Sequence, residues 1–362
     1  SYWHGSHQDY FKLYDYAVEG VRRALPQARV GGPETAGGPG GKFLEQFLDH
    51  CAHGTNYVTG KIGSPLDFIS FHAKGSTKFV DGHVEMGLAN QFRDMNNAFA
   101  VIAASPEFGK LPVIIGESDP EGCAACTDPQ DGYRNGTQYA SYTAASIARE
   151  YQLAQKHGVN LQGALTWAFE FEGQPPFAGF RALATDGIDL PVLNVFRLFS
   201  KMSGERVAVD GGTGYDAEKI LRHGVRGNPD VSGLAAYDSE KGRVTVMVWN
   251  YADDDVPGPE AAVDLALDGL PMQNGRVRVT EFRIDTDHSD AFAAWQRMGS
   301  PLPLSKEQYA TLEKAGQLAP GTEQKLRVAN GRLVIPSLRL PRQAVSLVVI
   351  DDLGPRHWFF WR

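Results

Sequence analysis

Short apolar segments in the first half of the chain run into side chains that could do acid–base chemistry or bind a sugar. Glu117 closes one such segment, and His72 and Lys74 follow another. A later segment carries the remaining candidates, Trp167, Glu170 and Glu172. Glutamates act as general acids, bases and nucleophiles, and the apolar face of an aromatic ring can stack on the C–H face of a sugar. Together these residue types indicate a carbohydrate site.

Glu117 has the setting that best suits catalysis. Residues 112–116 before it are largely apolar, Gly116 permits close approach of a neighbouring group, and Pro120 ends the strand. A carboxylate at the lip of a buried strand is desolvated on one side and open to a ligand on the other, as a nucleophile or general base requires. From the pattern alone, a salt bridge to a neighbouring loop explains Glu117 equally well, and His72 and Trp167 could be structural residues.

Other common catalytic and binding motifs are incomplete. Residues 37–42 resemble a phosphate-binding loop, but Ala36 and Phe43 occupy positions where that motif needs glycine and Ser/Thr. No G-x-G-x-x-G follows a predicted strand, and no G-x-S-x-G offers a nucleophilic serine. Cys123 and Cys126 have zinc or redox spacing, but the second half of a zinc site and the strand and helix of a redox motif are missing. We therefore interpret them as loop thiols, which are bridged if the protein is exported.

The elements that must position these residues alternate between strands and helices. Apolar runs predict strands at 28–32, 66–72, 112–117 and 162–170. Helical spacing predicts helices at 11–25, 43–51, 84–104, 138–156 and 190–202. This alternation is typical of parallel βαβ units, whose working residues lie at the carboxyl ends of the strands. We therefore expect one curved sheet with Glu34, His72, Glu117 and Trp167 at the same end.

Near residue 204 the pattern changes to short strands separated by turn residues. These are predicted at 231–237, 243–250, 261–267, 276–284, 332–336 and 344–350, with a short helix at 307–315. We expect two domains, residues 1–203 and an all-β sandwich at 204–362. Residues 285–300 interrupt the strands and carry Phe292 and Trp295. We expect this insertion to fold back on the first domain and fix the inter-domain angle; the alternative is packing on its own sandwich.

The composition excludes several classes of protein. Of 362 residues, 42% are hydrophobic and 22% are charged, as in a folded domain rather than a disordered chain. No apolar run reaches the roughly 18 residues of a membrane helix. With 43 acidic and 35 basic residues the net charge is −8, which disfavours binding to nucleic acid or an anionic membrane. We expect a small carbohydrate as the partner and leave homo-oligomerisation and cellular compartment open.

Several segments, taken in order, resemble glycoside hydrolase family 39, which contains β-xylosidases and α-L-iduronidases. The opening SYWHG, YFKLYDY at 10–16 and RVGGP at 29–33 resemble the region that follows the family's acid/base glutamate. DFISFH at 67–72 resembles the sixth strand with its active-site histidine, and PVIIGE at 112–117 the seventh with its nucleophilic glutamate. LTW at 165–167 resembles the eighth strand with its sugar-platform tryptophan, and the β-rich region resembles the family's accessory β-sandwich.

The resemblance implies both a fold and a mechanism. The fold is α/β plus all-β: the C-terminal half of a (β/α)8 TIM barrel, strands five to eight, followed by a β-sandwich. The mechanism is that of a retaining glycosidase acting on β-xylosides in xylo-oligosaccharides, with Glu117 attacking the anomeric carbon. The resemblance implies no metal and no organic cofactor. His72 would hold a sugar hydroxyl or the nucleophile, and Glu170 or Glu172 would bind hydroxyls deeper in the pocket.

One departure from the family pattern affects the expected activity. The family's acid/base lies in a W-N-E-P segment, and no Asn-Glu dipeptide occurs in this chain, which we interpret as starting just after that segment. Strands one to four of the barrel would then be absent, leaving two open sheet edges. We expect such a chain to hydrolyse unactivated glycosides poorly.

Three alternative functions stay open. Lys74 lies in a stretch that resembles the iduronidase relatives' lysine for a sugar carboxylate, which would favour uronides. A chain that keeps the pocket without the acid/base could be a non-catalytic carbohydrate-binding protein. An open-sheet enzyme complete in itself would use Glu34 or Glu121 as the partner of Glu117.

Overall fold

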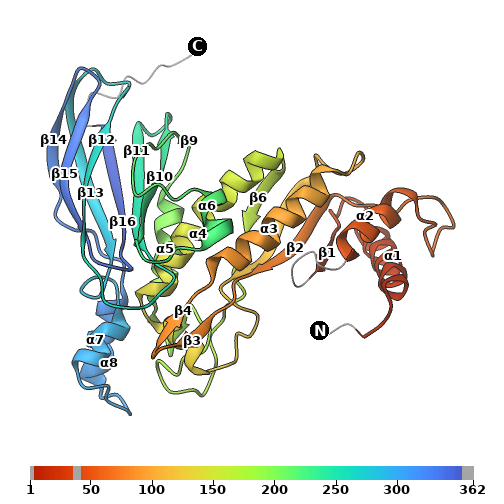
Figure 1. Cartoon of the computed structure of the whole chain (residues 1–362), viewed down its shortest axis with the longest axis horizontal. Coiled ribbons are helices and arrows are strands. Elements are labelled where there is room, and N and C mark those ends of the chain that lie inside the picture. Colours follow the sequence, from red (N-terminus) through yellow and green to blue (C-terminus); the bar gives the residue numbers. More distant parts are fainter. Residues whose placement is uncertain (1–3, 36–41, 353–362) are drawn as a thin grey trace.

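Four parallel strands form the sheet that carries the candidate residues (Figure 1). Their order is β1 (Gly31–Thr35), β2 (Phe68–Lys74), β5 (Pro112–Asp119) and β6 (Asn160–Ala164), and each neighbouring pair is parallel. This computed structural model describes residues 4–35 and 42–352. The first three residues of the opening SYWHG and residues 37–41 of the glycine-rich stretch lie outside the described residues.

Helices cover one face of this sheet and bury its apolar side chains. They are α1 (His7–Ala24), α2 (Phe43–His53), α3 (Leu88–Ala103), α4 (Thr137–His157) and α5 (Pro191–Lys201). Ile69 and Phe71 of β2 and Val113 and Ile115 of β5 are almost fully buried in the same apolar cluster as side chains from α2, α3 and α4. None of the described helices combines the length and apolar character needed to cross a membrane.

Three predicted boundaries are wrong. The first strand was predicted at 28–32, whereas β1 covers Gly31–Thr35. The helix predicted at 84–104 begins only at Leu88, because a hairpin of β3 (Lys78–Val80) and β4 (His83–Glu85) precedes it. Asp81 and Gly82 both have positive φ, as a two-residue hairpin turn requires. The strand predicted at 162–170 ends at Ala164. Trp167 therefore lies in the loop after β6 rather than within the strand.

The second half of the chain forms two antiparallel sheets. The larger has the order β14-β13-β16-β11-β10-β9, and the smaller pairs β12 with β15. Their bounds are β9 (Glu205–Val207), β10 (Asp230–Asp238), β11 (Arg243–Tyr251), β12 (Ala261–Leu267), β13 (Asn274–Ile284), β14 (Gln324–Ala329), β15 (Leu333–Leu340) and β16 (Val345–Asp352). The six predicted strands all occur, while β9 and β14 were not predicted. A separate apolar cluster joins the two sheets.

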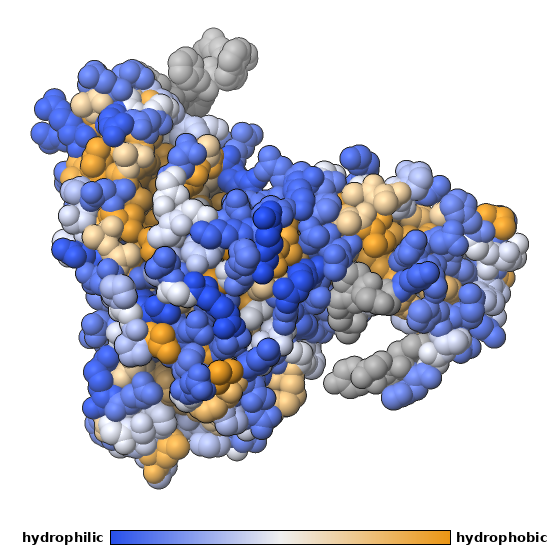
Figure 2. Space-filling model, viewed as in Figure 1, coloured by the Kyte–Doolittle hydropathy of each residue, from blue (hydrophilic) through white to orange (hydrophobic). Residues whose placement is uncertain are grey.

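The larger antiparallel sheet also shares a core with the helices of the parallel sheet. Met247, Trp249 and Leu347 are fully buried in the cluster that contains the residues of α3, α4 and α5. A buried ion pair crosses the same contact, with Arg149 of α4 at 2.9 Å from Asp230 of β10. Figure 2 shows that polar residues cover the middle of the molecule, whereas apolar ones also reach the surface over the antiparallel sheets.

The insertion predicted at 285–300 contacts the first half of the chain, as expected. It includes α7 (Ala291–Arg297), and α8 (Lys306–Gly316) follows it. The ring centroids of Phe292 and Trp295 lie 5.6 and 5.1 Å from that of Phe177. This contact confirms that the insertion packs back on residues before 204, while its control of the inter-domain angle stays a prediction. The remaining short elements are η1 (Pro129–Asn135), β7 (Ala184–Thr185), β8 (Ile188–Asp189) and α6 (Ala217–His223).

A buried polar layer lies between β5 and α4. Glu150 of α4 accepts hydrogen bonds from the hydroxyls of Ser118, at 2.7 Å, and Ser146, at 3.2 Å. Gln91 of α3 donates to the same Ser118 oxygen at 2.7 Å. Burial raises the pKa of Glu150 from 4.5 to about 7, because the interior disfavours the charged carboxylate. The layer thus contains an acid that holds its proton well above the usual range.

The raised pKa of Glu150 predicts that the stability of the protein depends on pH. Between pH 4.5 and about 7 the folded chain keeps a proton on Glu150 that the unfolded chain releases, so the stability contributed by this group falls as pH rises. Glu150→Gln keeps a neutral hydrogen-bonding group and removes the dependence. We expect the variant to be more stable than the wild type at pH 8, by at most about 3 kcal/mol, and equal to it near pH 4.

Urea denaturation at several pH values measures this difference. Glu240→Gln, at an exposed position in the β10–β11 turn, is the matched control and should show no pH-dependent change. A constant difference between Glu150→Gln and the wild type at all pH values would contradict the prediction.

Candidate active site

An extra residue in β5 decides which way Glu117 points. In the pairing of β2 with β5, Phe71 lies opposite Ile115 and His72 lies opposite Glu117, so Gly116 is a bulge without a partner. Side chains alternate between the two faces of a strand, and Ile115 points into the buried core. Without the bulge, Glu117 would point into the core as well. The extra glycine turns Glu117 to the face that carries His72.

A second bulge places Glu34 beside the first. Glu34 is the unpaired residue between Pro33 and Thr35 in the pairing of β1 with β2. Its φ of 49° lies in the left-handed region, which is costly for a residue other than glycine and is common at functional sites. The Glu34 carboxylate fills the space next to Gly116, where an added Cβ would lie 2.2 Å from its Oε1 atom. A larger residue at position 116 would therefore push the Glu34 carboxylate out of this place.

The predicted residues Glu117, His72 and Lys74 lie together at the ends of β2 and β5. The Lys74 ammonium is 2.6 Å from a Glu117 carboxylate oxygen. The His72 ring lies between two glutamates, with Nε2 at 3.1 Å from Glu34 and Nδ1 at 3.5 Å from Glu117. The side chain of Glu117 is 22% exposed and that of Lys74 is 14% exposed, so both are largely desolvated but reachable.

Asp119 completes this group and was not singled out from the sequence. Its fully buried carboxylate is 2.5 Å from the Lys74 ammonium. It also accepts hydrogen bonds from the Thr166 hydroxyl at 2.6 Å and from the Trp167 backbone N–H at 3.2 Å. The sequence spacing could have indicated Asp119. Glu117 and Asp119 are two residues apart on one strand, and they pair with His72 and Lys74, which are also two residues apart.

Trp167 is tied to the site through Asp119 and Arg181. Its carbonyl accepts a hydrogen bond from Arg181 Nε at 2.9 Å, and the Arg181 guanidinium carbon lies 5.8 Å from the centre of its ring. Phe169 packs edge-on against the same ring at 5.1 Å. The Trp167 side chain is 38% exposed, which leaves part of a flat apolar surface open near the strand ends. Its role as a sugar platform stays a prediction.

The other two predicted binding residues lie further along the loop after β6. Glu170 accepts a hydrogen bond from the Gly187 backbone N–H at 2.8 Å. Glu172 is exposed to solvent. Within the part of the chain that the structure describes, no hydrogen bond or ion pair joins either residue to Glu117. The structure therefore brings Glu117, His72 and Lys74 together, and leaves Glu170 and Glu172 outside that contact group.

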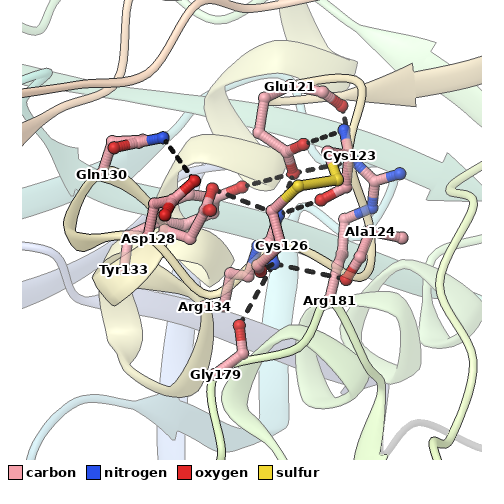
Figure 3. Close-up of a disulfide and its surroundings, with 11 residues drawn as sticks. Glu121, Cys123, Ala124, Cys126, Asp128, Gln130, Tyr133, Arg134, Gly179 and Arg181 are labelled. Atoms are coloured by element: carbon pink, nitrogen blue, oxygen red, sulfur yellow. Dashed lines mark hydrogen bonds and ion pairs between the residues drawn. A yellow bond between two sulfur atoms is a disulfide. The ribbon is translucent and has the colours of Figure 1, made fainter.

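The two carboxylates considered as partners of Glu117 have different surroundings. Glu34 is 47% exposed on its side chain and contacts His72. Glu121 instead accepts hydrogen bonds or ion pairs from Arg134, Arg181 and Tyr133, at 2.8, 2.8 and 3.0 Å (Figure 3). The oxygens of Glu121 are thus engaged in a structural network. Glu34, which contacts His72, is therefore the carboxylate beside the group of Glu117, His72 and Lys74.

Cys123 and Cys126 form a disulfide in the same loop, which is the bridged form of the interpretation made from the sequence (Figure 3). The third cysteine, Cys51, is free and buried. Among the described residues, no cluster of His, Cys, Asp and Glu side chains has the arrangement of a metal site.

The geometry of this group suits attack by a carboxylate on an electrophilic carbon. Lys74 and His72 orient Glu117 from two sides, while its remaining surface is open to solvent. Buried Asp119 offsets the charge of Lys74 from behind, so the ammonium does not stand alone against Glu117. A carboxylate held in place on two sides and partly exposed is an arrangement that can attack such a carbon.

Comparisons with known proteins find a matching family model and several relatives. A family model described as glycosyl hydrolases family 39 matches residues 1–332. The α-L-iduronidase of Homo sapiens is 28% identical over 367 residues, which cover 92% of this chain and 52% of that protein. The β-xylosidase of Caldicellulosiruptor saccharolyticus is 26% identical over 353 residues, covering 96% of this chain and 65% of that protein. The chain spans about half the length of the human relative.

Solved structures show the same fold. A bacterial orthologue of human α-L-iduronidase superposes with a TM-score of 0.76 at 19% identity, covering 98% of this chain and 60% of the other. A monomeric β-xylosidase from Caulobacter crescentus CB15 superposes with a TM-score of 0.69 at 22% identity, covering 96% of this chain and 66% of the other.

The close contact between Gly116 and Glu34 predicts a strong effect of one added methyl group. Gly116→Ala should displace the Glu34 carboxylate from His72 with little loss of stability, because the Glu34 side chain is 47% exposed and can move into solvent. NMR signals of the His72 ring should shift, since one of its carboxylate contacts is lost. Gly163→Ala in β6 is the matched control, because an added Cβ there meets nothing within 4 Å. Unchanged His72 signals in Gly116→Ala would refute the placement of Glu34.

Proposed function

This chain belongs to glycosyl hydrolase family 39, and on that premise we propose that it carries the nucleophile side of a retaining glycosidase site. The observation that carries the proposal is the position of Glu117, which lies at a strand end with Lys74 at 2.6 Å and His72 at 3.5 Å. Glu117 attacks the anomeric carbon and forms a glycosyl ester, while the aglycone leaves. Water then hydrolyses the ester and returns Glu117 to its starting state.

The neighbours of Glu117 have distinct roles in this proposal. Lys74 and His72 orient the attacking carboxylate, and Asp119 holds Lys74 in place. Trp167 provides the apolar surface under the sugar ring, and Glu170 and Glu172 bind hydroxyl groups further along the loop. His72 also lies within reach of Glu34, which links the nucleophile to the end of β1.

The second carboxyl group of the reaction must protonate the leaving oxygen. We propose that the four described βα units correspond to strands five to eight of a (β/α)8 barrel and that this acid comes from the preceding half. Two facts support this: the chain spans only part of the length of its relatives, and no Asn-Glu dipeptide occurs in it. Glu34 is the nearest alternative donor, because it contacts His72 at 3.1 Å.

We favour β-xylosides as substrates. β-Xylosidases are among the relatives of the chain, and Lys74 is already neutralised by two carboxylates, Glu117 and Asp119. A neutral sugar needs no further positive charge in the pocket. Lys74 can serve such a substrate by orienting the nucleophile.

A uronide is the second candidate, and one observation favours it. An ammonium group has three N–H donors, and the contacts of Lys74 with described residues occupy two of them. The third is free to meet a sugar carboxylate. α-L-Iduronidases are also among the relatives. A non-catalytic sugar-binding protein would keep the same pocket but would form no covalent intermediate.

Covalent labelling tests the role of Glu117. An activated 2-fluoro-β-xyloside should label Glu117, and digestion with mass spectrometry should place the sugar on the peptide that contains residues 112–119. Glu117→Ala should abolish labelling, whereas Glu240→Ala, in an exposed turn, should leave it unchanged. A label on any other carboxylate would refute the assignment. Labelling by a 2-fluoro-uronide but not by the xyloside would favour the second candidate.

Leaving-group dependence tests where the acid comes from. General acid catalysis contributes about 10²–10⁴-fold, and it matters least for aglycones that leave without a proton. The purified chain should therefore turn over 4-nitrophenyl β-xyloside far better, relative to full-length relatives, than it turns over xylobiose. If xylobiose is hydrolysed at a normal rate and Glu34→Gln removes that activity, Glu34 is the acid and the barrel-half proposal is wrong.

A further inference from the structure

The disulfide closes a short loop directly after the strand that carries Glu117. Cys123 and Cys126 are three residues apart, and the Cys126 backbone N–H donates to the Cys123 carbonyl within the same turn. Cys123 is exposed and Cys126 is partly exposed, so a small thiol can reach the bridge. The loop begins only one residue after Asp119, at Pro120.

A fully buried arginine fills the inside of this loop. Arg134 of η1 donates to the carbonyls of Cys123, Ala124 and Cys126, which all turn toward it (Figure 3). It also donates to the Gly179 carbonyl at 3.1 Å and pairs with Glu121 at 2.8 Å. A buried guanidinium is costly unless its donors are satisfied. The carbonyls of the disulfide loop accept hydrogen bonds from both terminal nitrogens of Arg134, Nη1 and Nη2, whereas its buried Nε has no hydrogen-bond partner among the described residues.

Glu121 joins Arg134 to a second buried arginine, Arg181, because it pairs with both. Arg181 is 0% exposed and pairs with Glu121 at 2.8 Å. The same guanidinium donates to the Trp167 carbonyl at 2.9 Å and lies 3.7 Å from Asp119. Asp119 in turn holds the Lys74 ammonium at 2.5 Å. A continuous set of polar contacts therefore runs from the disulfide to Trp167 and to Lys74.

We propose that the Cys123–Cys126 disulfide and Arg134 position Trp167, Asp119 and Lys74, so that reducing the disulfide loosens this group and weakens sugar binding. The positioning part of the proposal stands on contacts alone, and the sugar-binding part rests on the proposed function. Arg134, Glu121 and Arg181 are positioning residues, since each acts through another side chain. The site thereby becomes sensitive to the thiol–disulfide state of its surroundings.

The redox step is an ordinary thiol–disulfide exchange. One thiol of a dithiol such as dithiothreitol attacks one sulfur of the bridge and forms a mixed disulfide. The second thiol of the reagent then attacks this mixed disulfide, so that the reagent leaves as a cyclic disulfide. Two electrons and two protons pass to Cys123 and Cys126, which become thiols. Cys51, the third cysteine, is already reduced.

Hydrogen exchange of the full chain tests the positioning part without any sugar. Reduction with dithiothreitol should speed amide exchange in the peptides that contain residues 120–135 and 165–183 by roughly tenfold. β16 (Val345–Asp352) should be unchanged and serves as the internal reference. Cys123→Ser/Cys126→Ser should match the reduced wild type, and Cys51→Ala should respond to reduction as the wild type does. Equal exchange in oxidised and reduced protein would overturn the proposal.

Labelling kinetics test the sugar-binding part. With the 2-fluoro-β-xyloside, reduction should raise the inhibition constant roughly tenfold, whereas simple loss of folded protein would lower the labelled fraction at an unchanged constant. Arg134→Lys should resemble the reduced protein even when oxidised, because lysine keeps the charge but cannot meet several carbonyls at once.

The two parts fail in distinguishable ways. If nothing is labelled in either state but exchange at 165–183 changes, the positioning role stands and the proposed function fails. If labelling occurs with the same constant in both states, the proposed function stands and the redox-sensitive binding is wrong. If Arg134→Lys does not fold, the comparison of oxidised and reduced wild type decides alone.

Discussion

The arrangement of the site depends on one constraint, the strict alternation of side chains along a β-strand. Val113 and Ile115 must point into the core under the helices, and that fixes the direction of every later residue in the strand. Gly116 breaks the alternation once, and the carboxylates of Glu117 and Asp119 then face His72 and Lys74. A strand without that extra residue would bury two carboxylates in an apolar core, which is prohibitively costly.

The same constraint explains why the charges of the site are so interdependent. Once turned to the face that carries His72 and Lys74, Glu117 and Asp119 lie against one ammonium, and Asp119 is fully buried. A buried carboxylate needs partners on every side, and it finds them in Lys74, Thr166 and the Trp167 backbone. Removing any one partner would leave the others uncompensated, so these residues form a single electrostatic unit.

Much of this arrangement could be predicted from sequence periodicity. The apolar run before Glu117 and the alternation of strands and helices predict a parallel sheet with Glu34, His72 and Glu117 at one end, which the structure confirms. The bulges were not predictable, because a one-residue slip leaves no trace in an apolar run. The fourth strand is predicted too long, with Trp167 inside it, because Leu165, Trp167 and Phe169 continue an alternating apolar pattern beyond the end of β6. Asp119 could have been found from its spacing to Glu117. The roles of Arg134 and Arg181 could not, since their partners come from loops distant in sequence.

The shared core between the two halves has a consequence for how the chain folds. Met247 and Trp249 of β11 are fully buried in the same cluster as the helices that cover the parallel sheet. Separating the halves near residue 203 would therefore expose an interior rather than a docking surface. The antiparallel part therefore supports the parallel sheet, because the two halves bury side chains in one shared apolar cluster. A change in the sandwich far from Glu117 can thus reduce the amount of folded protein without altering the contacts of Glu117.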